Sequence, residues 1–245
     1  MKTLLTGNLG TSLTPRQPIL QEIIVRLPHT LNLACSSMIV ALVIGIPTGI
    51  IAAIKKDTFI DNLLTTTSLA GISIPNFWLG SMLILLFSVT LRWLPTGGMN
   101  EPFWTAVGFK QAILPSISLG LAVAAGFTRI GRSAMLDVLQ SDYIRTAKSK
   151  GIKGYKVILI HALRNAMIPI ITQFGTSFGG LLGGAIITEQ VFVINGVGTY
   201  LINAINQRNY PVVQSTVLVI AAMFIIVNLI VDLVYVLIDP RISYE

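Results

Sequence analysis

Five long runs of apolar residues constrain the fold of this chain more than any other feature. The runs are Leu31–Ile54, Thr65–Leu91, Ala112–Ile130, Ala166–Ile194 and Val212–Ile238. Each is close to the roughly 20 residues that a helix needs to cross the hydrocarbon core of a bilayer. Only 11% of the 245 residues are charged, against about 25% in soluble domains. The sequence therefore predicts an all-α, polytopic membrane protein with five transmembrane helices.

The basic residues indicate which side of the membrane each connection faces, because cytoplasmic loops are enriched in Lys and Arg. If the loop 142–165, between the third and fourth runs, is cytoplasmic, 11 of the 17 basic residues lie on the inner side. We therefore predict an extracytoplasmic segment at 1–30, a transmembrane domain at 31–238 and a cytoplasmic tail at 239–245. The formal net charge of +7 is then mainly a topology signal, and we expect no nucleic acid partner.

The N-terminal segment is unusual for an exported one. Residues 1–28 are polar and lack the charged and then apolar pattern of a signal peptide. Export of such a tail with no hydrophobic helix before it is unfavourable. We expect a preceding span that this sequence does not contain, with direct export of the tail as the alternative.

Residues that could carry covalent or metal chemistry are sparse. Cys35 is the single cysteine, so one chain can form neither a disulfide nor a Cys-based metal site. Residues 175–179 fit the pattern G-x-S-x-G, but Ser177 would need a histidine base, and His29 and His161 both lie outside the apolar runs. The phosphate-loop pattern G-x-x-x-x-G-K-[ST] does not occur. We expect no catalytic residue, no metal and no cofactor bound by this chain.

Polar residues beside helix breakers are candidates for a transport path. Pro75 interrupts the second run, and a proline in lipid is tolerated only where neighbouring helices or a cavity satisfy the freed carbonyl groups. The candidate path residues are Ser73, Asn76, Gln173 and Ser177. The alternative is an ordinary kink that packs on neighbouring helices.

Two further patterns in the last two runs favour structural roles. Glycines spaced by four residues allow close helix packing, and they are Gly175, Gly179, Gly180, Gly183 and Gly184. Three polar residues, Glu189, Asn228 and Asp232, lie within or near these runs. Polar groups in a membrane usually face protein or water, and we interpret these three as helix-packing residues rather than substrate contacts.

The loop 142–165 is the most distinctive segment of the chain. Ser141 or Asp142 can cap a short helix, and Gly151 can end it with a positive φ. A second, amphipathic helix is expected over Tyr155–Ala166, with Pro169 marking the entry to the next run. Such a loop can project a short helix into a groove of a soluble subunit. The alternative is a helix that lies on an anionic membrane surface.

The spacing A147-x3-G151-x9-H161-x-L163 resembles the "EAA" loop of bacterial ABC-importer permeases. The segments DYIRTAKSKG, HALRNAMIP, LLGGAIITEQVF, YPVVQ, VNLIVDLVYVLIDPRI, RLPHTLNL and ISIPNFWLG resemble the dipeptide/oligopeptide/nickel permease family, in its first subunit type. The resemblance covers nearly the whole chain. Four positions depart from the general pattern, since Arg145 and Thr146 replace its Glu–Ala pair and His161 and Arg164 replace its final Ile and Pro. Family members normally have six spans, and here the first is expected to be missing.

This resemblance implies a permease subunit of an ATP-binding-cassette importer in the bacterial cytoplasmic membrane, forming half of a path for di- or oligopeptides. Two separate ATP-binding subunits would hydrolyse ATP with Mg²⁺, and a second homologous permease and an extracytoplasmic solute-binding protein would complete the importer. The residues expected to couple to the ATP-binding subunits are Tyr143, Arg145, Ala147, Lys148, Lys150, Gly151, Lys153, His161 and Arg164.

Two alternatives remain open at this point. One is a nickel or metal-chelate importer of the same family. The other is a gradient-driven secondary transporter, which would be expected to carry charged residues deep in several spans. The apolar runs of this chain are almost uncharged, which favours the importer.

Overall fold

The computed structural model describes residues 9–14 and 16–238. The predicted cytoplasmic tail, 239–245, and residues 1–8 of the predicted N-terminal segment lie outside the described residues. Within the described part the chain is helical, and its only β contact is an isolated bridge between Thr11 and Pro18. The predicted all-α class is confirmed.

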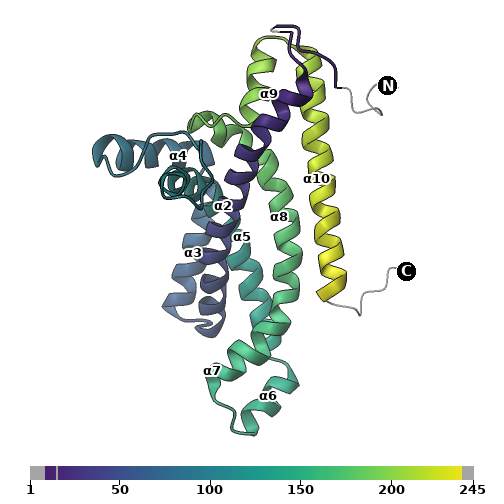
Figure 1. Cartoon of the computed structure of the whole chain (residues 1–245). Coiled ribbons are helices and arrows are strands. Elements are labelled where there is room, and N and C mark those ends of the chain that lie inside the picture. Colours follow the sequence, from purple (N-terminus) through teal and green to yellow (C-terminus); the bar gives the residue numbers. More distant parts are fainter. Residues whose placement is uncertain (1–8, 15, 239–245) are drawn as a thin grey trace. The chain divides into compact units, whose positions relative to one another are not determined.

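The helices follow one another along the chain as labelled in Figure 1. Their bounds are α2 Ile19–Ile54, α3 Phe59–Ser73, α4 Asn76–Leu83, the π-helix η1 Ile84–Thr90, α5 Ala106–Leu139, α6 Asp142–Ser149, α7 Gly154–Lys156, the π-helix η2 Val157–Ala162, α8 Leu163–Val191, α9 Val197–Asn206 and α10 Tyr210–Ile238. Four described stretches are long and apolar enough to cross a membrane, namely Ile19–Ile54, Ala106–Leu139, Gly154–Gly183 and Tyr210–Ile230. A fifth is obtained if the broken pair of α3 with α4 and η1 counts as one span.

The second predicted run is two helices and not one. Ile74 (φ −83°, ψ 123°) and Pro75 (φ −62°, ψ 131°) are both extended, so α3 ends at Ser73 and α4 begins at Asn76. Proline has no N–H to donate and disfavours the helical conformation of the residue before it. The sequence marked Pro75 as a helix breaker within the run Thr65–Leu91, and the structure confirms a complete break there.

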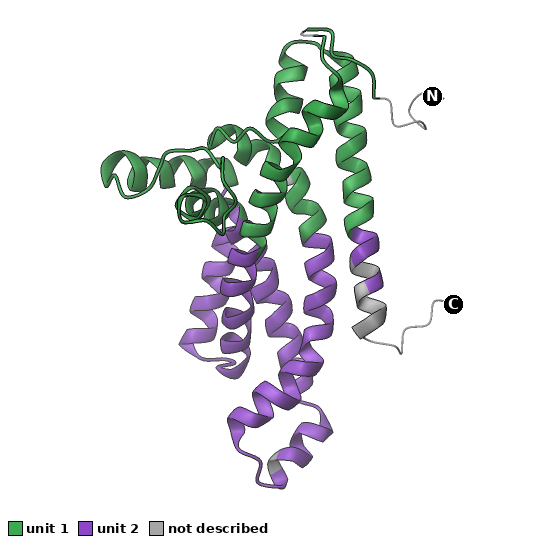
Figure 2. Cartoon of the chain, in the orientation of Figure 1, with its two compact units in different colours: residues 1–38, 75–119, 178–227 green, residues 39–74, 120–177, 228–245 purple. Residues whose placement is uncertain are grey.

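The chain divides into two compact units, coloured separately in Figure 2. Unit 1 comprises residues 1–38, 75–119 and 178–227, and unit 2 comprises 39–74, 120–177 and 228–245. Four helices are divided between the units, with one part in unit 1 and the other part in unit 2; they are α2, α5, α8 and α10.

Small residues allow α2 and α5 to pack closely within unit 2. A Cβ added at Gly45 would lie 2.6 Å from the main-chain oxygen of Ala124, and one at Gly49 would lie 2.7 Å from that of Thr128. The hydroxyl groups of Thr48 and Thr128 are hydrogen-bonded at 2.6 Å across the same seam. At such distances no larger side chain fits, so the glycines determine how near the two helices approach.

Each unit has its own buried apolar cluster. In unit 2 the cluster is Ala53, Ala134, Met135, Ile144, Ala147, Val157, Ala162 and Ala166. In unit 1 it is Ile19, Ile23, Val197, Ala204 and Val212. The first of these clusters draws residues from the loop 142–165, which is therefore a packed part of its unit.

Candidate functional site

The predicted coupling loop folds as two helices joined by a turn at Gly151. The first is α6, and Gly151 follows it with φ +76°, the left-handed conformation that the sequence predicted. The second helix starts at Gly154 and continues through α7 and η2 into α8. Hereafter the coupling segment means residues 142–165.

Two details of this segment differ from the prediction. Ser141 donates its hydroxyl hydrogen bond backward to the main-chain oxygen of Val138, 2.6 Å away, instead of capping α6. Pro169 lies inside α8 and does not mark a boundary. A proline removes one backbone hydrogen bond without ending a membrane helix when neighbouring groups satisfy the freed carbonyl.

The buried face of the coupling segment rests on α2 and α5 of the same unit. Ile144 and Ala147 of α6 join Val157 and Ala162 of the second helix in the cluster with Ala53, Ala134 and Met135. Ala147, a predicted contact residue, is only 8% exposed and so belongs to the core of unit 2. This packing connects the segment mechanically to α5.

The other predicted coupling residues lie mainly on the outer face. Tyr143, Arg145, Lys150, Gly151, Lys153 and Arg164 are exposed, and His161 is half-buried. The Tyr143 hydroxyl accepts a hydrogen bond from Asn165 Nδ2 at 2.6 Å, which ties α6 to the second helix. Arg145 lies 3.6 Å from Asp142, and both side chains are largely exposed. The side chain of Lys148 lies outside the described part of the structure.

The same segment also carries a strip of exposed apolar residues. The sequence predicted an amphipathic helix here but not which of its residues would be exposed. Tyr155, Leu159 and Ile160 are 58%, 58% and 56% exposed on the second helix. Tyr155 and Leu159 are one helical turn apart and so share a face. Their spacing was visible in the sequence, but which face of the helix packs inward was decided by Val157 and Ala162.

The predicted path residues fall into both units. Ser73 ends α3 in unit 2, where its hydroxyl donates to the main-chain oxygen of Leu69 at 3.0 Å. Asn76 begins α4 in unit 1, where its main-chain oxygen accepts a hydrogen bond from Ser118 Oγ at 2.7 Å. Gln173 donates to Ser177 Oγ at 2.8 Å along α8 in unit 2, so the structure brings these two together.

Gln173 also lines a groove of unit 2 between α5 and α8. The groove holds about 580 Å³ and its polar lining residues are Ser133, Asp137, Thr172, Gln173 and Thr176. The lining surface of this groove is mainly apolar, and its five polar residues could hydrogen-bond a polar solute or the water around it.

Glu189 organises a polar network in unit 1. Its side chain is fully buried, Oε1 accepts a hydrogen bond from Thr30 Oγ1 at 2.6 Å, and Oε2 accepts one from the Thr199 N–H at 2.9 Å. Thr30 Oγ1 in turn accepts the N–H of Val197 at 2.9 Å. The carboxylate thus holds the first turn of α9, which confirms the structural interpretation of Glu189. Asn228 has contacts of its own, and the burial of Gly184 and the side chain of Asp232 are outside the described part.

Comparisons with known proteins agree with this architecture. Residues 45–244 match the family described as "Binding-protein-dependent transport system inner membrane component". The chain is 42% identical over 260 residues to the di/tripeptide transport system permease of Pseudomonas aeruginosa, covering 98% of this chain and 77% of that protein. It is 44% identical over 265 residues to the dipeptide permease of Alkalihalophilus pseudofirmus, covering 100% and 80%.

The glutathione transport system permease of Escherichia coli K12 is 44% identical over 239 residues, covering 98% of this chain and 76% of that protein. Among solved structures, an inward-facing form of the MetNI methionine ABC transporter superposes with a TM-score of 0.73 at 16% identity, covering 91% of this chain and 99% of that one. That likeness concerns the fold alone. Taken with the helical membrane architecture, these matches show that the chain belongs to the family of binding-protein-dependent inner membrane transport components and is a permease subunit of an ABC importer.

Proposed function

We propose that this permease carries di- or tripeptides and is driven by separate ATP-binding subunits that dock on the coupling segment. The names of its relatives support peptide cargo and favour it over nickel. The observation that carries the docking proposal is the two-sided character of the segment. One side is packed into unit 2, and the other presents basic residues and the exposed strip of Tyr155, Leu159 and Ile160.

In this proposal the outer face supplies the contacts and the inner face transmits the movement. Tyr143, Arg145, Lys148, Lys150, Lys153 and Arg164 would provide polar contacts to the ATP-binding subunits. Gly151 would set the angle between α6 and the second helix, while Ala147 and His161 would position them. Because protein interiors are close-packed and transmit strain, a push on the segment would reach α2 and α5 through the shared cluster.

The remaining parts of the importer follow from the same proposal. ATP and Mg²⁺ would be bound and hydrolysed by the partner subunits. A second homologous permease would complete a path to which Ser73, Asn76, Gln173 and Ser177 contribute polar groups. An extracytoplasmic solute-binding protein would deliver the peptide, with the N-terminus of this chain outside and its C-terminus in the cytoplasm.

Replacing Leu159 by glutamate tests the docking surface. If the side chain enters a groove of an ATP-binding subunit, a carboxylate there loses the apolar burial, worth about 1.5–3 kcal/mol for leucine. We expect at least a tenfold weaker association of the ATP-binding subunits, measured by co-purification, and a matching loss of dipeptide uptake in proteoliposomes.

The control is Leu13→Glu, because Leu13 is equally exposed, at 59%, but lies outside the coupling segment. It should leave co-purification unchanged. Full association and uptake in the Leu159→Glu protein would contradict the docking proposal. Uptake of labelled Ni²⁺ that added dipeptides do not compete with would instead contradict the peptide assignment.

A further inference from the structure

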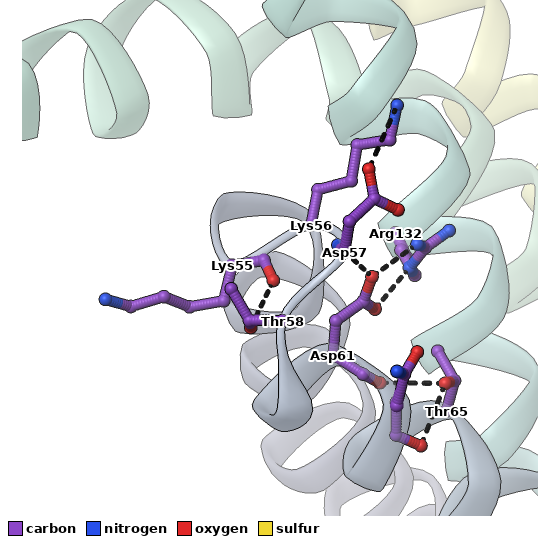
Figure 3. A network of polar contacts seen from close by, with 8 residues as sticks. Lys55, Lys56, Asp57, Thr58, Asp61, Thr65 and Arg132 are labelled. Carbon is purple, nitrogen blue, oxygen red and sulfur yellow. Dashed lines mark hydrogen bonds and ion pairs between the residues drawn. The ribbon is translucent and has the colours of Figure 1, made fainter.

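A buried ion pair joins α3 to α5 within unit 2 (Figure 3). Arg132 donates from Nε to Asp61 Oδ1 at 2.7 Å and from Nη2 to Oδ2 at 2.6 Å. The Asp61 side chain is 2% exposed and that of Arg132 is 27% exposed. Two parallel charge-assisted hydrogen bonds fix the mutual orientation of the two groups as well as their distance.

The turn between α2 and α3 completes the site of the carboxylate. The N–H of Asp57 donates to Asp61 Oδ2 at 3.0 Å, and Thr65 Oγ1 donates to the main-chain oxygen of Asp61 at 2.7 Å. The other charged groups at this turn are more loosely held, since Lys56 and Asp57 lie 3.9 Å apart with side chains 47% and 81% exposed. Asp61 is thus the carboxylate of this turn that is built into the interior.

A pair of this kind contributes geometry more than stability. Removing two charges from water is costly, and apolar side chains of similar size often stabilise a protein as well or better. What apolar side chains lack is the fixed direction of the paired hydrogen bonds. The pair therefore sets where α3 lies against α5.

The same part of α5 supports the coupling segment. Ala134 and Met135 lie two and three residues after Arg132 and belong to the same core cluster as Ile144 and Ala147. On the other side, α3 leads from Asp61 to Ser73 and the break at Ile74 and Pro75. A continuous set of contacts therefore runs from the coupling segment through α5 and the ion pair to α3.

We propose that Asp61 and Arg132 are positioning residues that make α3 move as one body with α5 and the coupling segment during the transport cycle. The inference rests on the proposed docking of ATP-binding subunits at that segment. When the pair is broken, ATP hydrolysis continues but α3 no longer follows α5, so hydrolysis and solute movement are uncoupled.

A distance measurement by double electron–electron resonance tests the rigid-body statement. Spin labels are placed at Leu69→Cys in α3 and Gln140→Cys after α5, both exposed sites of unit 2, with Cys35, the single native cysteine, replaced by serine. In the assembled complex we expect the same narrow distance distribution without nucleotide and after trapping with ATP and vanadate. In the Asp61→Asn variant we expect a distribution at least twice as broad.

Two further variants separate positioning from stability. Asp61→Leu combined with Arg132→Met leaves no unpaired charge, so it should insert and assemble normally and still show the broad distribution. Asp57→Asn removes a carboxylate from the same turn without touching the ion pair, and should keep the narrow one. If the ion pair served only to stabilise unit 2, the apolar double variant would show the narrow distance distribution again.

The functional readout is ATP hydrolysed per molecule of tritiated dialanine imported into proteoliposomes in the presence of the binding protein. We expect this ratio to rise at least tenfold in Asp61→Asn and in the apolar double variant, and less than twofold in Asp57→Asn. The inference is overturned if the distance between the two labels changes with nucleotide while the ion pair is intact. It is also overturned if the apolar double variant keeps the parental label distance and the parental ratio of ATP to dialanine. Failure of the ATP-binding subunits to co-purify with the intact protein would refute the proposed docking instead, and the nucleotide-free distances would still test the pair.

Discussion

Replacing Gly151 by proline is expected to abolish solute uptake, while the same replacement at Gly154 is expected to leave it within about twofold of the parental rate. Gly151 has φ +76°, and proline is locked near φ −65°. The turn after α6 would have to rearrange, and with it the angle at which α6 meets its docking partner. Uptake in proteoliposomes and co-purification of the ATP-binding subunits measure the effect.

The control at Gly154 is well matched to this test. Gly154 is the first residue of α7, and Lys153 before it is already extended, with φ −55° and ψ 133°. Proline is favoured at the first helical position, and the extended conformation suits the residue before it. An added Cβ would meet no atom within 4 Å at either glycine, so this atom fits at both positions and the positive φ of Gly151 distinguishes them.

A second pair of variants at Gly151 tests whether the positive φ of this residue is what uptake requires. Asparagine tolerates the left-handed conformation better than other residues that carry a Cβ, and valine tolerates it poorly. Gly151→Asn should therefore retain most of the uptake, and Gly151→Val should lose most of it. If proline or valine at 151 supported parental uptake, the left-handed turn would have no role in coupling.

Removing the carboxylate of Glu189 is expected to produce a large loss of stability. In Glu189→Ala the Thr30 hydroxyl and the Thr199 N–H lose their acceptors. An unsatisfied buried polar group costs about 1–3 kcal/mol, and the vacated space adds a further cavity cost. The total of about 3 kcal/mol or more corresponds to a fall in Tm of about 6–12 °C for a chain of this size.

Thermal unfolding in detergent measures this loss, and two variants define its origin. Glu189→Gln keeps an acceptor oxygen and most of the volume, so it should lose less than half as much. Glu101→Ala removes an exposed carboxylate of the same unit and should change stability by about 0.5 kcal/mol at most. Equal losses from Glu189→Ala and Glu101→Ala would show that the buried network does not stabilise unit 1.

Much of the architecture could be predicted because lipid leaves the chain few choices. A run of about 20 apolar residues must satisfy its backbone groups internally, and so becomes a helix. The four spanning stretches and the broken fifth correspond to the five predicted runs. The turn at Gly151 was also predictable, because a glycine that follows a helix directly is the residue best able to adopt a positive φ.

The candidate site was predictable only as a segment and not as a surface. Its basic residues and two helices were expected, but Ala147 proved to be core, while Leu159 and Ile160 were left exposed. A helix with apolar residues on more than one face can pack in several ways. The partner helices decide between them, and here α2 and α5 selected Val157 and Ala162 as the inner face.

The sequence by itself determined the class of protein, the position of the membrane helices and the place of the coupling segment, because these follow from local composition and from backbone hydrogen bonding in lipid. Only the tertiary structure decided that Asp61 pairs with Arg132, 71 residues away, and that Glu189 bonds to Thr30, 159 residues away. Such contacts depend on which helices pack together and at what distance. Glycines at close approaches such as Gly45 and Gly49 set those distances, and their effect is visible only when both helices are in place.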